Sequence, residues 1–135
     1  MIVYLLEEVL YVKKDDSDGE RIEYRLADGF WANKRKLLQA KKRIENSLAD
    51  GWENVVTEFD MKINKRQKYL YVLNHEYSIK DGTCFYYQFK PQTSIRECRK
   101  QKAFLSQSPE YKKQKGRIYN KKNGGWFIEK YPIVF

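Results

Sequence analysis

The sequence has few of the residues that build metal centres and disulfide frameworks. It holds two cysteines and one histidine among 135 residues, and Cys84 and Cys98 do not form a C-x-x-C pair. A structural zinc ion usually takes four Cys or His ligands, so the chain by itself excludes such a site. We therefore expect two buried thiols in a cytoplasmic protein, with no metal and no cofactor.

Long apolar runs and glycine-rich motifs are also missing. The longest apolar run, residues 2–6, is far too short to span a membrane, and the N-terminus lacks the order of regions typical of a signal peptide. The sequence has no phosphate-binding loop, no dinucleotide fingerprint and no nucleophile motif. These absences favour a non-enzymatic protein with no membrane partner.

The chain is instead rich in aromatic residues and in positive charge. Eleven Tyr, seven Phe and three Trp are present, and the formal net charge is +9. Residues 90–122 contain eleven Lys and Arg against Glu97 and Glu110, so this one stretch carries +9. A local positive field attracts polyanions, which makes the stretch the first candidate for a binding site.

The residue pattern predicts a single α+β domain over 1–135, with an antiparallel sheet of about five to seven strands, two main helices and a short third helix. Residues 2–12 and 20–26 read as a hairpin that ends at 28–31. A three-stranded meander is expected over 53–63, 68–79 and 83–90, followed by two final strands at 117–119 and 126–135. Helices are expected at 33–49, where Asn33 can cap the first turn, and at 94–107, where Ser94 and Glu97 form a capping box. A short third helix is expected from Ser108 to Gly116.

A short echo occurs along the chain. The sequence Leu-Ala-Asp-Gly appears at 26–29 and at 48–51, each time closely followed by Trp, and Trp126 follows Gly125. We interpret the echo as turn chemistry followed by an anchoring aromatic residue, because repeat architectures recur at least three times.

The basic segment over 90–122 is the leading candidate for binding nucleic acid. Arg96 and Lys100, and likewise Arg99 and Lys102, lie one helical turn apart and could follow a phosphate backbone. The full predicted site, including two tyrosines for stacking on bases, is Arg96, Arg99, Lys100, Lys102, Tyr111, Lys112, Lys113, Lys115, Arg117 and Tyr119. An auxiliary basic face is expected on the first helix, made of Lys34, Arg35, Lys36, Lys42 and Arg43. The alternative for both groups is a solvated surface that binds nothing.

One face of the predicted meander mixes aromatic and charged residues. It should be either covered by an amphipathic helix or used for binding. His75 lies on this face, and its expected neighbours, Val56 and Tyr87, suit a partly buried imidazole better than a catalytic base.

The same meander suggests an enzymatic alternative. Glu58, Asp60 and Lys62 alternate along one strand, and two carboxylates with a lysine are the groups that a Mg²⁺-dependent nuclease uses. Such triplets also arise on ordinary exposed strands through cross-strand pairing.

The sequence therefore predicts a small basic protein that binds nucleic acid, or a complex containing nucleic acid, without catalysing a reaction. A second hypothesis is an accessory or inhibitory protein of a phage or mobile element, which would act by protein contacts on a machine that handles nucleic acid. The third is the nuclease.

Overall fold

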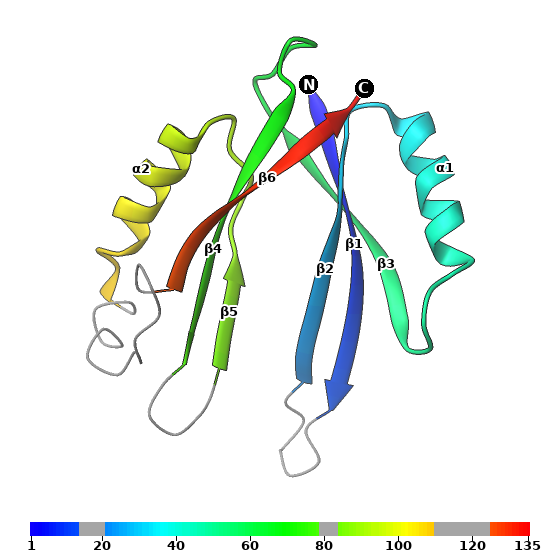
Figure 1. Cartoon of the computed structure of the whole chain (residues 1–135), viewed down its shortest axis with the longest axis horizontal. Coiled ribbons are helices and arrows are strands. Elements are labelled where there is room, and N and C mark those ends of the chain that lie inside the picture. Colours follow the sequence, from blue (N-terminus) through cyan, green and yellow to red (C-terminus); the bar gives the residue numbers. More distant parts are fainter. Residues whose placement is uncertain (14–20, 79–83, 110–124) are drawn as a thin grey trace. The chain divides into compact units, whose positions relative to one another are not determined.

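The computed structural model describes residues 1–13, 21–78, 84–109 and 125–135 (Figure 1). The helix expected from Ser108 and the strand expected at 117–119 fall largely or wholly on residues 110–124, outside this description. The described elements are, in chain order, β1 (Ile2–Lys13), β2 (Arg21–Trp31), α1 (Lys34–Glu45), β3 (Trp52–Asp60), β4 (Tyr69–Ser78), β5 (Cys84–Gln88), α2 (Ile95–Leu105) and β6 (Trp126–Val134).

The six strands are hydrogen-bonded in the order β3-β1-β2-β6-β4-β5. The prediction of an antiparallel sheet is wrong, because β6 runs parallel to β2, with Phe30 opposite Ile133 and Trp31 opposite Val134. The sheet is therefore mixed. Two parallel strands must be joined by a long crossover, which here is the chain that runs from β2 to β6. No local turn sequence could therefore predict the pairing of these two strands.

The predicted meander is also wrong in its first step. β3 pairs with β1, with Val56 opposite Leu6, and not with β4. The expected turn at Asn64 is present, and the Asn64 side chain accepts a hydrogen bond from the Arg66 backbone N–H. The strands that it connects, β3 and β4, do not pair with each other. The second step is correct, because β4 and β5 pair antiparallel in the register counted from the expected turn, with His75 opposite Tyr87.

The chain divides into two compact units. Unit 1 contains residues 1–68 and 132–135, and unit 2 contains residues 69–131. The strand β6 thus belongs to unit 2 over most of its length and to unit 1 at its end.

In unit 1, the hairpin of β1 and β2 is longer than the sequence suggested. The expected break at 28–31 is wrong, because β2 continues to Trp31 and accommodates the extra residue in a bulge next to Leu6 and Glu7. Helix α1 packs on one face of these strands, where Leu6, Leu37 and Ala40 are buried and Ile44 and Val56 close the cluster.

In unit 2, helix α2 packs on β4 and β6. Leu73, Cys98 and Trp126 form the buried cluster, and Leu105 and Ile128 pack against it. The direction of β6 follows from two contacts. Trp126 stacks on His75 and Lys130 lies over Tyr69, so residues later in β6 meet residues earlier in β4 and the two strands are antiparallel.

Both units have the same topology. Each begins with an antiparallel hairpin, continues into a helix and ends with a strand that lies beside the first strand of its hairpin (Figure 1). The order is third-first-second in each case, β3-β1-β2 and β6-β4-β5. The chain therefore contains two ββαβ repeats, and our expectation that it has no repeat architecture is wrong. The Leu-Ala-Asp-Gly echo does not mark these repeats, because both of its copies lie in unit 1.

Glycine and tryptophan mark equivalent positions in the two repeats. Gly51 and Gly125 have backbone φ angles of 85° and 83°, and each directly precedes the Trp that begins the third strand, Trp52 or Trp126. A positive φ of this size is readily available only to glycine. Of the two Leu-Ala-Asp-Gly copies, only the one at 48–51 directly precedes a third strand, because the copy at 26–29 lies within β2.

Candidate nucleic-acid interface

Helix α2 begins and is held in place as its sequence predicts. The Ser94 side chain accepts a hydrogen bond from the Glu97 backbone N–H at 3.1 Å, which caps the first turn. Cys98 is fully buried, and its Sγ lies 3.5 Å from the carbonyl oxygen of Tyr71. Burial raises the pKa of the Cys98 thiol, so this cysteine is a packing residue and not a nucleophile. The exposed side of the helix carries most of its charged residues, together with Phe104.

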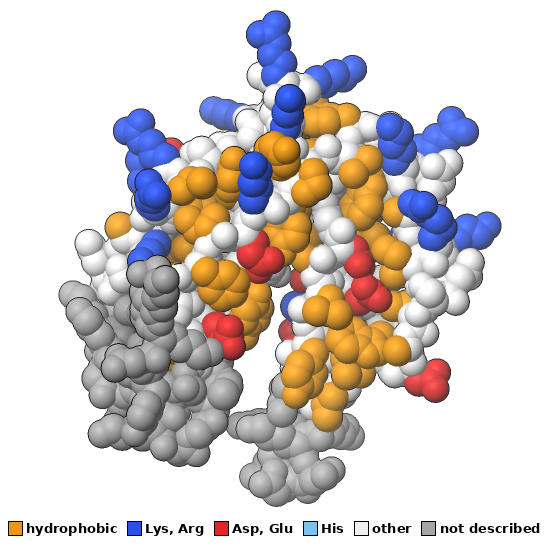
Figure 2. Space-filling view, viewed as in Figure 1, with side chains coloured by type: hydrophobic (Ala, Val, Ile, Leu, Met, Phe, Trp, Pro, Cys, Tyr) orange, Lys and Arg blue, Asp and Glu red, His pale blue; other side chains and the backbone are white. Residues whose placement is uncertain are grey.

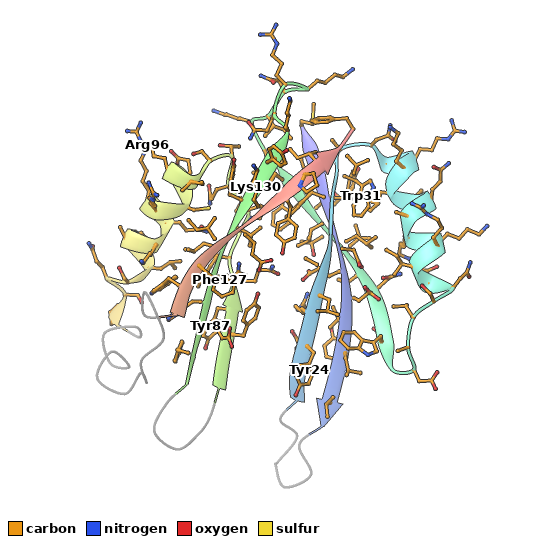
Figure 3. The ribbon with its side chains drawn as sticks, viewed as in Figure 1. Tyr24, Trp31, Tyr87, Arg96, Phe127 and Lys130 are labelled. Carbon is orange, nitrogen blue, oxygen red and sulfur yellow. The ribbon has the colours of Figure 1, made fainter. Side chains whose placement is uncertain are left out.

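That exposed side carries the predicted cations. Arg96, Arg99 and Lys100 are exposed and Lys102 is half-buried. Lys100 pairs with Glu97 at 3.3 Å, and within the described ranges the other three cations form no ion pair. Four cations against one carboxylate leave the helix with a charge of +3. Figure 2 shows Lys and Arg side chains projecting along α2, and Figure 3 shows Arg96 pointing away from the strands.

The rest of the predicted site is not described. Its six members, Tyr111, Lys112, Lys113, Lys115, Arg117 and Tyr119, lie in residues 110–124, outside the described part of the chain.

The auxiliary basic face lies on α1. Asn33 caps this helix by accepting a hydrogen bond from the Lys36 backbone N–H at 3.1 Å. All five predicted cations are exposed. Lys36 donates to the backbone oxygen of Phe135, while the other four form no ion pair with residues that the structure describes: Lys34, Arg35, Lys42 and Arg43.

The aromatic face of β4 and β5 is covered in part by α2, which is one of the two outcomes expected for it. Tyr71 and Phe89 pack against the cluster around Cys98. His75 is 2% exposed and stacks on Trp126, with ring centroids 3.9 Å apart and planes 5° from parallel. The expected neighbour Tyr87 is confirmed and Val56 is wrong, since Val56 lies in unit 1 opposite Leu6.

The other face of β4 carries a polar network that the sequence analysis missed. The Asn74 amide donates to Glu129 at 3.1 Å, and the Tyr131 hydroxyl donates to the same carboxylate at 2.7 Å. The Tyr86 hydroxyl donates to Asn74 Oδ1 at 2.8 Å. Asn74 is fully buried, so these bonds satisfy a polar group that would otherwise be costly to bury. Its only sequence signal is the alternation of side chains along β4 and β6.

The three nuclease candidates lie in unit 1, on β3 and just beyond its end. Glu58 and Asp60 are exposed on β3, and Lys62 lies beyond its end. The Asp60 carboxylate pairs with the N-terminal ammonium of Met1 at 3.3 Å. Among the described residues, no three His, Cys, Asp or Glu side chains lie close enough together to hold a metal ion.

The bulge in unit 1 brings carboxyl groups together. Glu7 is 3% exposed and pairs with Arg25 at 3.1 Å, and burial raises the pKa of Glu7 although Arg25 opposes the shift. Asp28 is the extra residue of the bulge, and its side chain remains partly open to solvent. Partial burial and a hydrogen bond with Glu8 raise the pKa of Asp28 to about 7. Asp28 thus holds a proton in the folded protein at a pH where the unfolded chain has lost it.

We expect Asp28→Asn to change how stability depends on pH. A carboxyl with a raised folded pKa stabilises the fold at low pH, and this contribution is lost as pH rises from about 4 to about 7. The variant should match the wild type near pH 4 and exceed it at pH 8, by on the order of 1 kcal/mol because solvent screens an exposed group. Urea unfolding across this pH range measures the difference.

Two observations would check the assignment. Glu7 titrates in the same direction, so the variant should flatten only part of the pH profile. Asp50→Asn, which removes a carboxylate from an exposed turn before β3, is the control and should leave the profile unchanged. A variant at Asp28 with the wild-type profile would contradict the raised pKa of Asp28.

No described helix has both the length and the apolar character needed to cross a membrane. Comparison of the chain with protein-family models, with curated proteins and with solved structures finds no match to any of them.

Proposed function

We propose that the protein binds nucleic acid, without catalysing a reaction, through the outer face of α2. This α2 face consists of Arg96, Arg99, Lys100 and Lys102. The observation that carries the proposal is an exposed helix of charge +3 whose arginines form no ion pair in the described part of the chain. The expected contacts of residues 110–122 belong to the same proposal.

Arginine at this spacing suits phosphate. A guanidinium donates two parallel hydrogen bonds to phosphate oxygens, and residues three apart on a helix lie on one side, as Arg96 and Arg99 do. The Phe104 ring is 79% exposed and lies one turn beyond Lys100, where it could stack on an unpaired base. These features favour nucleic acid over a partner recognised by charge alone.

We expect the double variant Arg96→Glu/Arg99→Glu to bind nucleic acid about tenfold or more weakly at low salt, because each phosphate contact releases counterions. The slope of log affinity against log salt should fall by about 2 when two contacts are lost. Fluorescence anisotropy with a labelled DNA duplex and a labelled single-stranded RNA measures both quantities, and the tighter ligand is used thereafter.

A matched control separates the face from net charge. Lys65→Glu/Arg66→Glu makes the same change in charge at an exposed turn between β3 and β4, and should change affinity much less. If the α2 variant binds as tightly as the wild type, the proposal is wrong. A nuclease-treated pull-down that retains a protein partner, together with unchanged nucleic-acid affinity, would favour the inhibitor hypothesis instead.

A further inference from the structure

The two helices occupy equivalent places in the two repeats, residue by residue. Counting from the caps Asn33 and Ser94, the third residue donates its backbone N–H to the cap in both. The fourth residue is the most buried of its helix, Leu37 at 2% and Cys98 at 0% exposed. The eleventh, Ile44 or Leu105, packs partly buried on the same cluster.

The equivalence extends to charge. The second residue after each cap is an exposed arginine, Arg35 or Arg96, and the eighth is a lysine, Lys41 or Lys102. Elsewhere the side chains differ, since Leu38 stands where α2 has Arg99. Within α1, six cations stand against Glu45, which pairs with Lys41, so its net charge is +5. Both repeats therefore present a cationic helix although most of their residues differ.

We propose that the protein is bivalent, with each ββαβ repeat contacting the phosphate backbone of the same nucleic acid through its own helix. This inference rests on the proposed function of α2 and makes α1 an equal partner. The α1 face is defined by Lys34, Arg35, Lys42 and Arg43. Two contacts in one chain raise the effective concentration of the second, so occupancy of one helix strengthens binding by the other.

The test compares matched reversals on the two helices. Arg35→Glu/Lys42→Glu changes two exposed cations of α1, and Arg96→Glu/Arg99→Glu changes two of α2. Each variant should weaken binding to a long ligand by about tenfold or more, and each should lower the salt slope by about 2. The quadruple variant should lose most of the remaining affinity. Circular dichroism and thermal melting confirm that the variants are folded.

Ligand length provides a second readout. For a bivalent protein, lengthening the ligand from about 8 to about 40 nucleotides or base pairs should raise affinity more than the number of added positions explains. Either double variant should remove this excess and leave only the proportional increase. The Lys65→Glu/Arg66→Glu control should retain the excess.

The outcomes separate this inference from the function on which it rests. If the α1 variant keeps wild-type affinity, salt slope and length dependence while the α2 variant loses affinity, bivalency is wrong and the proposed function stands. If neither variant changes binding, both are wrong. If the control weakens binding as much as the helix variants, net charge governs affinity and the assignment to two helices fails.

Discussion

Gly125→Ala is expected to unfold unit 2 or to reduce its stability by about 3–5 kcal/mol, the range of severe single substitutions. Gly125 has a φ of 83° and directly precedes Trp126, the first residue of β6. A Cβ at this position would overlap the backbone carbonyl of Glu76 on β4. The atoms nearest to this Cβ all belong to the backbone of Glu76, so no flexible side chain can move to make room. The backbone at Gly125 or the strand β4 must shift instead. Urea unfolding, followed by circular dichroism, measures the loss.

The equivalent glycine of the other repeat is the matched control. Gly51 has a φ of 85°, but a Cβ there would meet only Leu10 Cδ1, at 3.3 Å. The cost of Gly51→Ala should be limited to the left-handed backbone, about 1–2 kcal/mol, because a leucine methyl group can shift. Equal losses for the two variants would contradict the close approach of Gly125 to β4.

Leu37→Ala is expected to cost about 3 kcal/mol, within the range measured for buried leucines. Leu37 is 2% exposed and packs with Leu6 and Ala40 between α1 and the strands of unit 1. Removing its branched end leaves a cavity that the surrounding strands cannot fill. The free energy of unfolding from urea titrations measures the effect.

Two variants calibrate this result. Leu38→Ala changes the neighbouring residue, which is 53% exposed, and should alter stability by no more than about 0.5 kcal/mol. Cys98→Ala, at the equivalent buried position of α2, removes one heavy atom and should cost about 1 kcal/mol. A loss at Leu38 as large as that at Leu37 would contradict the packing of α1.

The elements that depend on local chemistry were predictable. Asn33 and Ser94 cap their helices as expected, and the two hairpins form where alternating residues flank turn sequences. The pairing of β3 with β1 and of β6 with β2 was not predictable from turns, because those partners are far apart in the sequence. One signal was available. Val3, Leu5, Leu6 and Val9 place apolar side chains on both faces of β1, a pattern typical of a strand in the interior of a sheet that is buried on both faces.

For the candidate site, the cations of α2 and α1 could be predicted from the sequence. That the two helices occupy equivalent places in two repeats could not. Charge segregation identified Arg96 and Arg99, and the structure places both on an exposed helix face. The repeat was not recognisable in the sequence because equivalent positions, such as Leu37 and Cys98, are both buried but hold different residues. The features kept in both repeats are the helix caps, the Gly-Trp pairs at 51–52 and 125–126, and two pairs of helix cations, Arg35 with Arg96 and Lys41 with Lys102.

The division of β6 between the units has a consequence for the order in which the chain is made. Ile133 and Val134 pair with Phe30 and Trp31 at the end of β2, and the Ile133 N–H also donates to the Lys68 carbonyl at 2.9 Å. During translation, β1, β2, α1 and β3 emerge long before these residues. Nascent unit 1 therefore carries an unpaired stretch of edge at the end of β2, the kind of feature prone to intermolecular association, until residues 132–135 have emerged and paired with it.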